Sequence, residues 1–167
     1  MSDEAVSSPP SSLGRRLELL RRMAWLCAVM VLVITSLSAF IRLSKAGLGC
    51  EPWPQCYGQE LRAQQLGEAS PEAGTATAVA RLAHRVIASS ALLLVLVMVM
   101  TALVSRPALW GPGRMALGLL LLALILAVLG RWTADARVPA VTLGNLLGGF
   151  AMFALSVSMA LAAGKAL

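Results

Sequence analysis

The amino-acid sequence predicts an all-α membrane protein built as a bundle of four transmembrane helices. The chain of 167 residues is 58% apolar and only 13% charged, and its mean hydropathy is +0.78. A soluble domain carries about 25% charged residues, and a chain this short cannot bury such an excess of apolar surface in one core. The charged residues also leave four long uncharged stretches, 23–41, 86–105, 115–130 and 138–164. These observations exclude a water-soluble enzyme, a soluble nucleic-acid-binding protein and a disordered chain.

Each uncharged stretch predicts one membrane-spanning helix. A helix needs about 20 residues, at roughly 1.5 Å each, to cross the ~30 Å hydrocarbon core. The first, second and fourth stretches reach about this length directly. The third, 115–130, is shorter and reaches it by including Arg131 and Trp132, whose long side chains extend to the interface. Because backbone polar groups in lipid must be satisfied within the segment, we expect helices near 22–43, 79–105, 114–132 and 139–163.

The first stretch predicts a retained helix rather than a cleaved signal peptide. Its 19 uncharged residues exceed the usual apolar length of a signal peptide, and Arg42 follows without a clear small-x-small cleavage site. Residues 1–14 are rich in serine and proline and predict a flexible tail. The four-helix domain is therefore expected to comprise residues 15–167.

Basic residues near the helix ends favour one orientation in the membrane. One side carries Arg15, Arg16, Arg21, Arg22, Arg106, Arg114 and Lys165. The other side carries Arg42, Lys45, Arg62, Arg81, Arg131 and Arg137. The cluster before the first helix usually decides topology, so we expect both termini in the cytoplasm and loop 43–78 in the periplasm. Anchoring in a bilayer thus explains the net charge of +6, and no nucleic acid is expected as a partner.

The loop after the first helix contains two closely spaced cysteines, Cys50 and Cys56. On the oxidising side of a membrane such a pair readily forms a disulfide, and Pro52 and Pro54 between them restrict the loop further. We therefore expect a rigid, disulfide-containing cap over the bundle. Two unrelated thiols and a metal site are the alternatives, although a metal site needs further ligands and no histidine lies nearby.

Three segments carry a resemblance to a known family. The run RLSKAGLGCEPWPQCYG at 42–58 resembles the first periplasmic loop of the haem A synthase (cytochrome oxidase assembly) family, and LGRWTADARVPAVTLGNLLGGF at 129–150 resembles the closing helix pair of one half of that family. The pair His84-Arg85 lies where the family places a haem-ligating histidine. Members usually have eight helices in two similar halves, and each half holds one haem between histidines on its second and fourth helices. This chain is similar to the N-terminal half alone. The resemblance also implies a location in the inner membrane of a bacterium.

His84 is the one histidine of the chain and the candidate ligand of a haem iron. A metal-binding side chain within a membrane span is costly and marks a functional site by default, and we favour a haem ligand over a structural histidine. The positions that share its helix face carry small or aliphatic residues: Ala80, Ala88, Ala91 and Val95. They leave room for a flat macrocycle, or alternatively for a neighbouring helix.

Three arginines at the same end of the helices are candidates for binding the haem propionates. Arg42, Arg85 and Arg131 lie at or near the outer ends of three predicted helices. A guanidinium group binds a carboxylate through paired hydrogen bonds. Ordinary anchoring at the interface explains Arg42 and Arg131 equally well.

The chain departs from the family pattern at two positions. Asn145 aligns with the second histidine, and an amide does not replace imidazole as an axial iron ligand. Arg81 stands where the family's first half commonly carries a glutamate. Gly144 and Gly148 beside Asn145 permit close approach of a helix or of a porphyrin face. A site with two histidine ligands would therefore need a second subunit.

The resemblance implies a haem A synthase-type oxidoreductase, which oxidises a methyl group of haem O to the formyl group of haem A. The cofactor would be a b-type haem or haem O or A, and the partners would be membrane lipid and a second copy, a full-length relative or oxidase assembly factors. The two departures favour the alternative of a non-catalytic haem-binding or assembly subunit. A structural membrane subunit without haem is the third possibility.

Overall fold

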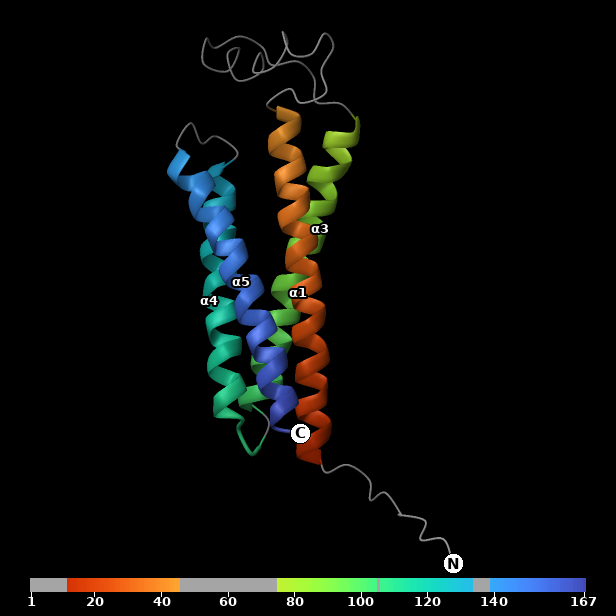
Figure 1. The fold of residues 1–167 in the computed structure, drawn as a ribbon, viewed down its shortest axis with the longest axis vertical. Coiled ribbons are helices and arrows are strands. Elements are labelled where there is room, and N and C mark those ends of the chain that lie inside the picture. Colours follow the sequence, from red (N-terminus) through yellow and green to blue (C-terminus); the bar gives the residue numbers. More distant parts are fainter. Residues whose placement is uncertain (1–11, 46–74, 105, 134–138) are drawn as a thin grey trace, which may run out of the picture. The chain divides into compact units, whose positions relative to one another are not determined.

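The computed structural model describes residues 12–45, 75–104, 106–133 and 139–167. In this part of the chain the prediction of an all-α membrane protein with four long apolar helices is confirmed (Figure 1). The helices are α1 (Ser12–Lys45), α3 (Thr75–Val99) continued by the π-helix η1 (Met100–Val104), α4 (Trp110–Thr133) and α5 (Pro139–Lys165). Each is long and apolar enough to cross a membrane.

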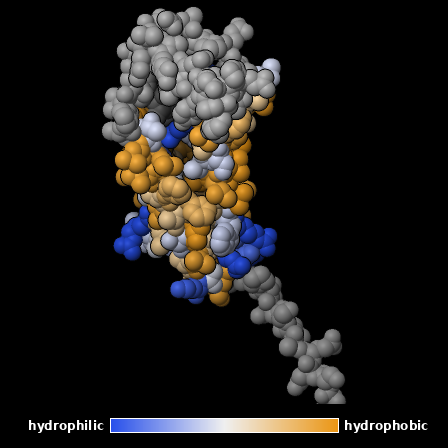
Figure 2. Space-filling model, turned by 45° about the horizontal axis from the view of Figure 1, so that its top comes forward, coloured by the Kyte–Doolittle hydropathy of each residue, from blue (hydrophilic) through white to orange (hydrophobic). Residues whose placement is uncertain are grey.

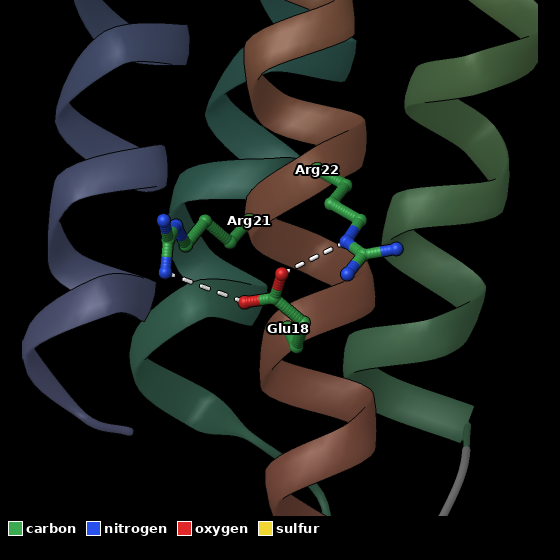
Figure 3. Close-up of polar contacts among 3 residues, drawn as sticks. All are labelled: Glu18, Arg21 and Arg22. Atoms are coloured by element: carbon green, nitrogen blue, oxygen red, sulfur yellow. Dashed lines mark hydrogen bonds and ion pairs between the residues drawn. The ribbon is translucent and has the colours of Figure 1, made fainter.

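Helix α1 begins at Ser12, ten residues before the predicted start near 22. Two features stabilise the added turns. Leu17 and Leu20 on one side of the helix are buried. Glu18 accepts hydrogen bonds from Arg21 at 3.4 Å and from Arg22 at 2.8 Å (Figure 3). Spacings of three and four residues bring these side chains to one side of a helix. The predicted flexible tail therefore overlaps the helix from Ser12 onward, and its residues 1–11 lie outside the described part.

The chain divides into two compact units, which are described separately. The larger unit comprises Met1–Ala28 and Leu92–Leu167, and the smaller unit comprises Val29–Ala91. The core of the larger unit includes the fully buried residues Leu20, Met98, Leu119 and Met159. In the smaller unit Val31, Ala80 and Ala91 are buried. Many other apolar side chains are exposed and colour much of the visible surface in Figure 2, as expected of helices whose outer sides face lipid.

In the larger unit, Arg16 ties the start of α1 to the end of η1. Its guanidinium group donates hydrogen bonds to the backbone oxygen of Thr101 at 2.8 Å and to that of Pro107 at 3.0 Å. The last carbonyl groups of a helix lack partners within the helix, so a cation that binds them caps the helix end. Arg16 therefore fixes the first turns of α1 to the connection between η1 and α4.

Helices α4 and α5 pack against each other in antiparallel directions along a row of glycines. A Cβ built at Gly148 would lie 2.5 Å from Cδ2 of Leu126, and one at Gly144 would lie 3.4 Å from Cδ2 of Leu129. Glycines four residues apart expose the backbone of one helix face and allow a neighbouring helix to approach closely. This close packing gives α4 and α5 a fixed register.

Candidate functional site

His84 lies in the third turn of α3, within the segment long and apolar enough to span a membrane. Its side chain is half-buried, and no hydrogen bond to the imidazole is found in the described part of the chain. A polar ring in an apolar span without a hydrogen-bond partner is costly unless a ligand uses it. The ring nitrogens of His84 are therefore available to bind a metal.

The face of α3 around His84 consists of small residues. Ala80 and Ala91 on this face are buried, and Ala88 is half-buried. Val95, at the same helical spacing, is fully buried. The structure thus places His84 on the side of α3 that faces protein rather than lipid.

Arg42 lies near the end of α1 and belongs to the same smaller unit as His84. Its side chain is half-buried, and its positive charge acts on the imidazole of His84. The structure therefore brings these two predicted site residues together, although they belong to different helices. An imidazole nitrogen can ligate a metal such as iron, and a guanidinium group can bind a carboxylate.

Arg85 and Arg81 are also in the smaller unit, but they are placed differently from Arg42. Arg85 is exposed, because the next position on a helix is turned by about 100° from His84. Arg81 is half-buried and lies three residues before His84, where the family pattern has a glutamate. Sequence adjacency to His84 therefore does not place Arg85 on the same helix face.

Asn145 and Arg131 belong to the larger unit. Asn145 is half-buried in the second turn of α5, and Arg131 is exposed in the last turn of α4. Residues at helical spacing from Asn145 are buried: Met152, Ser156, Met159 and Ala163. Asn145 therefore lies on the inward face of α5.

One contact shows what the inward face of α5 meets within the larger unit. The hydroxyl of Ser156 donates a hydrogen bond to the backbone oxygen of Met152 at 2.8 Å and lies 3.5 Å from Sγ of Cys27 on α1. Gly144 and Gly148 face Leu129 and Leu126 of α4. Of the two possibilities raised for these glycines, the structure shows close packing of a helix.

Two further results concern the other predicted site residues. Cys50 and Cys56, predicted to form a disulfide, lie outside the described residues. In the part of the chain that the structure describes, no group of three or more His, Cys, Asp or Glu side chains could hold a metal ion.

Arg16 has a structural role that the sequence does not indicate. The sequence predicts it only as a determinant of topology, and no motif indicates its hydrogen bonds to the carbonyls of Thr101 and Pro107.

Comparisons of the sequence with known proteins identify the family of the chain. The model of the family described as cytochrome oxidase assembly protein (COX15-CtaA) matches residues 21–166. The chain is 34% identical over 146 residues to the heme A synthase of Shewanella oneidensis, covering 80% of this chain and 43% of that protein. The chain thus spans less than half the length of this curated relative. No solved structure matches the chain. The predicted family is confirmed: the chain is a multi-pass membrane protein that belongs to the cytochrome oxidase assembly protein family.

Proposed function

We propose that this chain binds haem through His84 and acts in haem A formation and cytochrome oxidase assembly. The observation that carries the proposal is the environment of His84, which is the one imidazole of the chain. It is half-buried in a membrane-spanning helix, has no hydrogen-bond partner in the described part, and lies near Arg42. Membership of the oxidase assembly family supports haem as the ligand.

Haem, when bound, supplies an iron that can exchange electrons and bind oxygen. His84 holds the iron through a ring nitrogen, and the small residues on its helix face leave space for the flat ring. Arg42 donates hydrogen bonds to a propionate carboxylate, because a guanidinium group fits a carboxylate in pairs. Arg85 and Arg131 are exposed and serve either a propionate or the anchoring of their helices at the interface.

In this proposal a second residue that holds the iron would come from a second subunit. Asn145 occupies the family's second histidine position, and its amide does not ligate iron as an imidazole does. Two copies of the chain would supply two His84 rings, and a full-length relative would supply its own histidine. The alternative within one chain is that His84 alone would hold the iron, which would then remain able to bind oxygen.

For the activity, we propose an oxidoreductase of the haem A synthase type, the activity named for the relative from Shewanella oneidensis. Two residues favour a second candidate, a non-catalytic haem-binding or assembly subunit. Asn145 removes one histidine ligand, and Arg81 replaces the glutamate of the family pattern. Formation of haem A in cells that make haem O but lack other synthases separates the two candidates.

We also propose the bacterial inner membrane as the location, with both termini in the cytoplasm and loop 43–78 in the periplasm. The four arginines within the first turns of α1, Arg15, Arg16, Arg21 and Arg22, support this orientation. A periplasmic position of the loop would expose Cys50 and Cys56 to oxidising conditions, which supports a disulfide between them.

Absorption spectra of the purified chain test the haem proposal. We expect the protein from haem-replete cells to show haem bands in detergent, and the variant His84→Ala to lose most of its haem, because the chain has no other imidazole. Ser90→Ala is the matched control, since Ser90 lies on the same helix, is exposed, and donates only to the backbone oxygen of Val86. Colourless wild-type protein, or equal haem content in both variants, would contradict the proposal and favour a structural subunit.

A further inference from the structure

One end of the larger unit carries a strong excess of positive charge. The first turns of α1, the connection between η1 and α4, and the end of α5 together contribute seven basic residues, which we call the basic collar: Arg15, Arg16, Arg21, Arg22, Arg106, Arg114 and Lys165. Glu18 is the one acidic residue among the described residues of these segments, 12–22, 106–114 and 164–167. Figure 2 shows hydrophilic residues gathered toward one end of the visible face, beyond a broad apolar surface.

Most basic side chains of the collar are exposed rather than used in contacts within the protein. Arg16 is the exception, because it binds the carbonyl groups of Thr101 and Pro107. The remaining six basic residues are exposed. Glu18 offsets only one charge, and it is shared by Arg21 and Arg22 (Figure 3). Each of these guanidinium groups has five N–H donors, so donors remain for an external anion.

Arg21 and Lys165 bring two of these cations to the junction of α1 and α5. In Figure 3 the Arg21 side chain extends toward α5, whereas Arg22 extends toward α3. A Cβ built at Gly164 would lie 3.6 Å from Cδ and 3.8 Å from Nε of Arg21. The arginine thus crosses α5 at a residue without a side chain. Lys165 is the next residue of α5 and is exposed, so its long side chain is within reach of a phosphodiester group that Arg21 binds.

Apolar side chains on the same helices extend from the collar toward the middle of the membrane-spanning segments. Exposed large apolar residues lie on all three helices that carry the collar: Leu13, Leu19 and Trp25 on α1, Trp110 and Leu117 on α4, and Leu161 on α5. Trp110 is 69% exposed at the first residue of α4, a position typical of tryptophan at a membrane interface. The collar therefore adjoins an exposed apolar surface.

We propose that the basic collar binds anionic phospholipid, with Arg21 and Lys165 holding the phosphate and neighbouring apolar residues contacting the acyl chains. The collar belongs to the ends of membrane-spanning helices, where lipid headgroups are the nearest anions. A free phosphate would not use the apolar surface, and a nucleic acid or soluble acidic protein would not contact it. The proposal concerns lipid selectivity and does not depend on whether His84 binds haem.

Titration of the full chain in zwitterionic detergent with phosphatidylglycerol and with phosphatidylcholine tests the proposal. We expect phosphatidylglycerol to bind more tightly and to raise the thermal midpoint, and the preference to weaken at high salt because salt screens exposed charges. Each cation near an anionic headgroup contributes roughly fivefold to affinity, so Arg21→Gln with Lys165→Gln should weaken phosphatidylglycerol binding by roughly 25-fold. Glu18→Gln removes the one negative charge of the collar and should increase the affinity for phosphatidylglycerol. Misfolding would lower this affinity, so an increase cannot result from misfolding.

The control replaces Arg81, near the start of α3, by glutamine and is compared with Arg21→Gln alone. This control should change binding by less than about twofold, because Arg81 is half-buried and does not belong to the collar. Circular dichroism and the thermal midpoint without lipid show whether each variant is folded. Equal binding of the two lipids, an equal loss in the control, or equal stabilisation by inorganic phosphate alone would overturn the proposal.

Discussion

His84 and Arg42 come from different helices but lie in the same compact unit, where the charge of the arginine acts on the imidazole. Each side chain alone has an ordinary explanation, a structural histidine or an interfacial arginine. Their juxtaposition provides a nitrogen ligand and a carboxylate-binding cation within one unit. Arg42 is thereby distinguished from Arg131, which is exposed in the other unit.

The substitution Asn145→His tests whether α5 carries the position of the missing second ligand. It adds an imidazole to the inward face of α5, where Met152 and Ser156 are buried. Because Asn145 stands where the family pattern has its second histidine, we expect the haem-loaded variant to show a low-spin, six-coordinate spectrum without a second subunit. Haem loss should become roughly tenfold slower, which corresponds to about 1.4 kcal/mol.

Leu147→His is the matched control for this experiment. Leu147 is 58% exposed and lies two residues from Asn145, which places it on the opposite side of α5. The control should leave the spectrum unchanged. Identical spectra for the two variants would show that Asn145 does not face the haem.

The sequence was sufficient to select His84, because a single histidine within an apolar stretch is conspicuous without any coordinates. It did not distinguish Arg42 from Arg85. Arg85 is adjacent to His84 in the chain but turned away on the helix surface, whereas Arg42 is close through the packing of the smaller unit. Contacts between residues so distant in sequence depend on helix packing, for which the pattern of apolar residues carries little information.

Among the helices, the contact of α4 with α5 depends most directly on particular residues. Gly148→Val tests this contact, because the new side chain would overlap Leu126, whose Cδ2 atom lies 2.5 Å from a Cβ at this position. Overpacking of this kind costs on the order of 1–3 kcal/mol. We therefore expect a lower thermal midpoint in detergent for this variant.

Gly130→Val is the control, because a Cβ at Gly130 has no atom of the described residues within 4 Å. Its thermal midpoint should stay close to that of the wild type, and Leu126→Ala combined with Gly148→Val should recover part of the loss. An equal decrease for the two glycine variants would show that Gly148 is not a packing position.

Helix boundaries were harder to predict than helix number. The predicted start of the first helix followed the last charged residue, Arg22, since lipid-spanning length was the criterion. The helix extends to Ser12 because Leu17 and Leu20 become buried and Glu18 pairs with Arg21 and Arg22. A charged amphipathic turn adds length outside the hydrocarbon core, and a hydropathy criterion does not detect it.

The chain as a whole has its strongest positive charge where α1 begins and α5 ends. Because Lys and Arg are retained on the cytoplasmic side, we expect both termini there. A fluorescent protein fused after Leu167 should be fluorescent, and alkaline phosphatase inserted within loop 43–78 should be active. The reverse pair of results would contradict the orientation, and fusions at the opposite positions serve as controls.

Family membership followed from short, unusual segments of sequence, and the comparisons confirmed it over residues 21–166. The number of helices followed from composition, because four long apolar stretches permit few other folds. The second iron ligand could not be derived in the same way. With Asn145 at the family's histidine position, a second ligand in the proposed haem site would have to come from a partner, which one chain does not specify.

The acceptors of the Arg16 hydrogen bonds have a consequence for sequence variation in relatives. Both are main-chain oxygens, so replacement of the Thr101 side chain would leave its acceptor in place. Pro107 differs, because its ring fixes the backbone that carries the second acceptor. Position 16 is also restricted, because two separate nitrogens of one rigid guanidinium reach two carbonyls, and the single ammonium of lysine lacks that span. We therefore expect relatives to vary freely at position 101 and to retain the arginine.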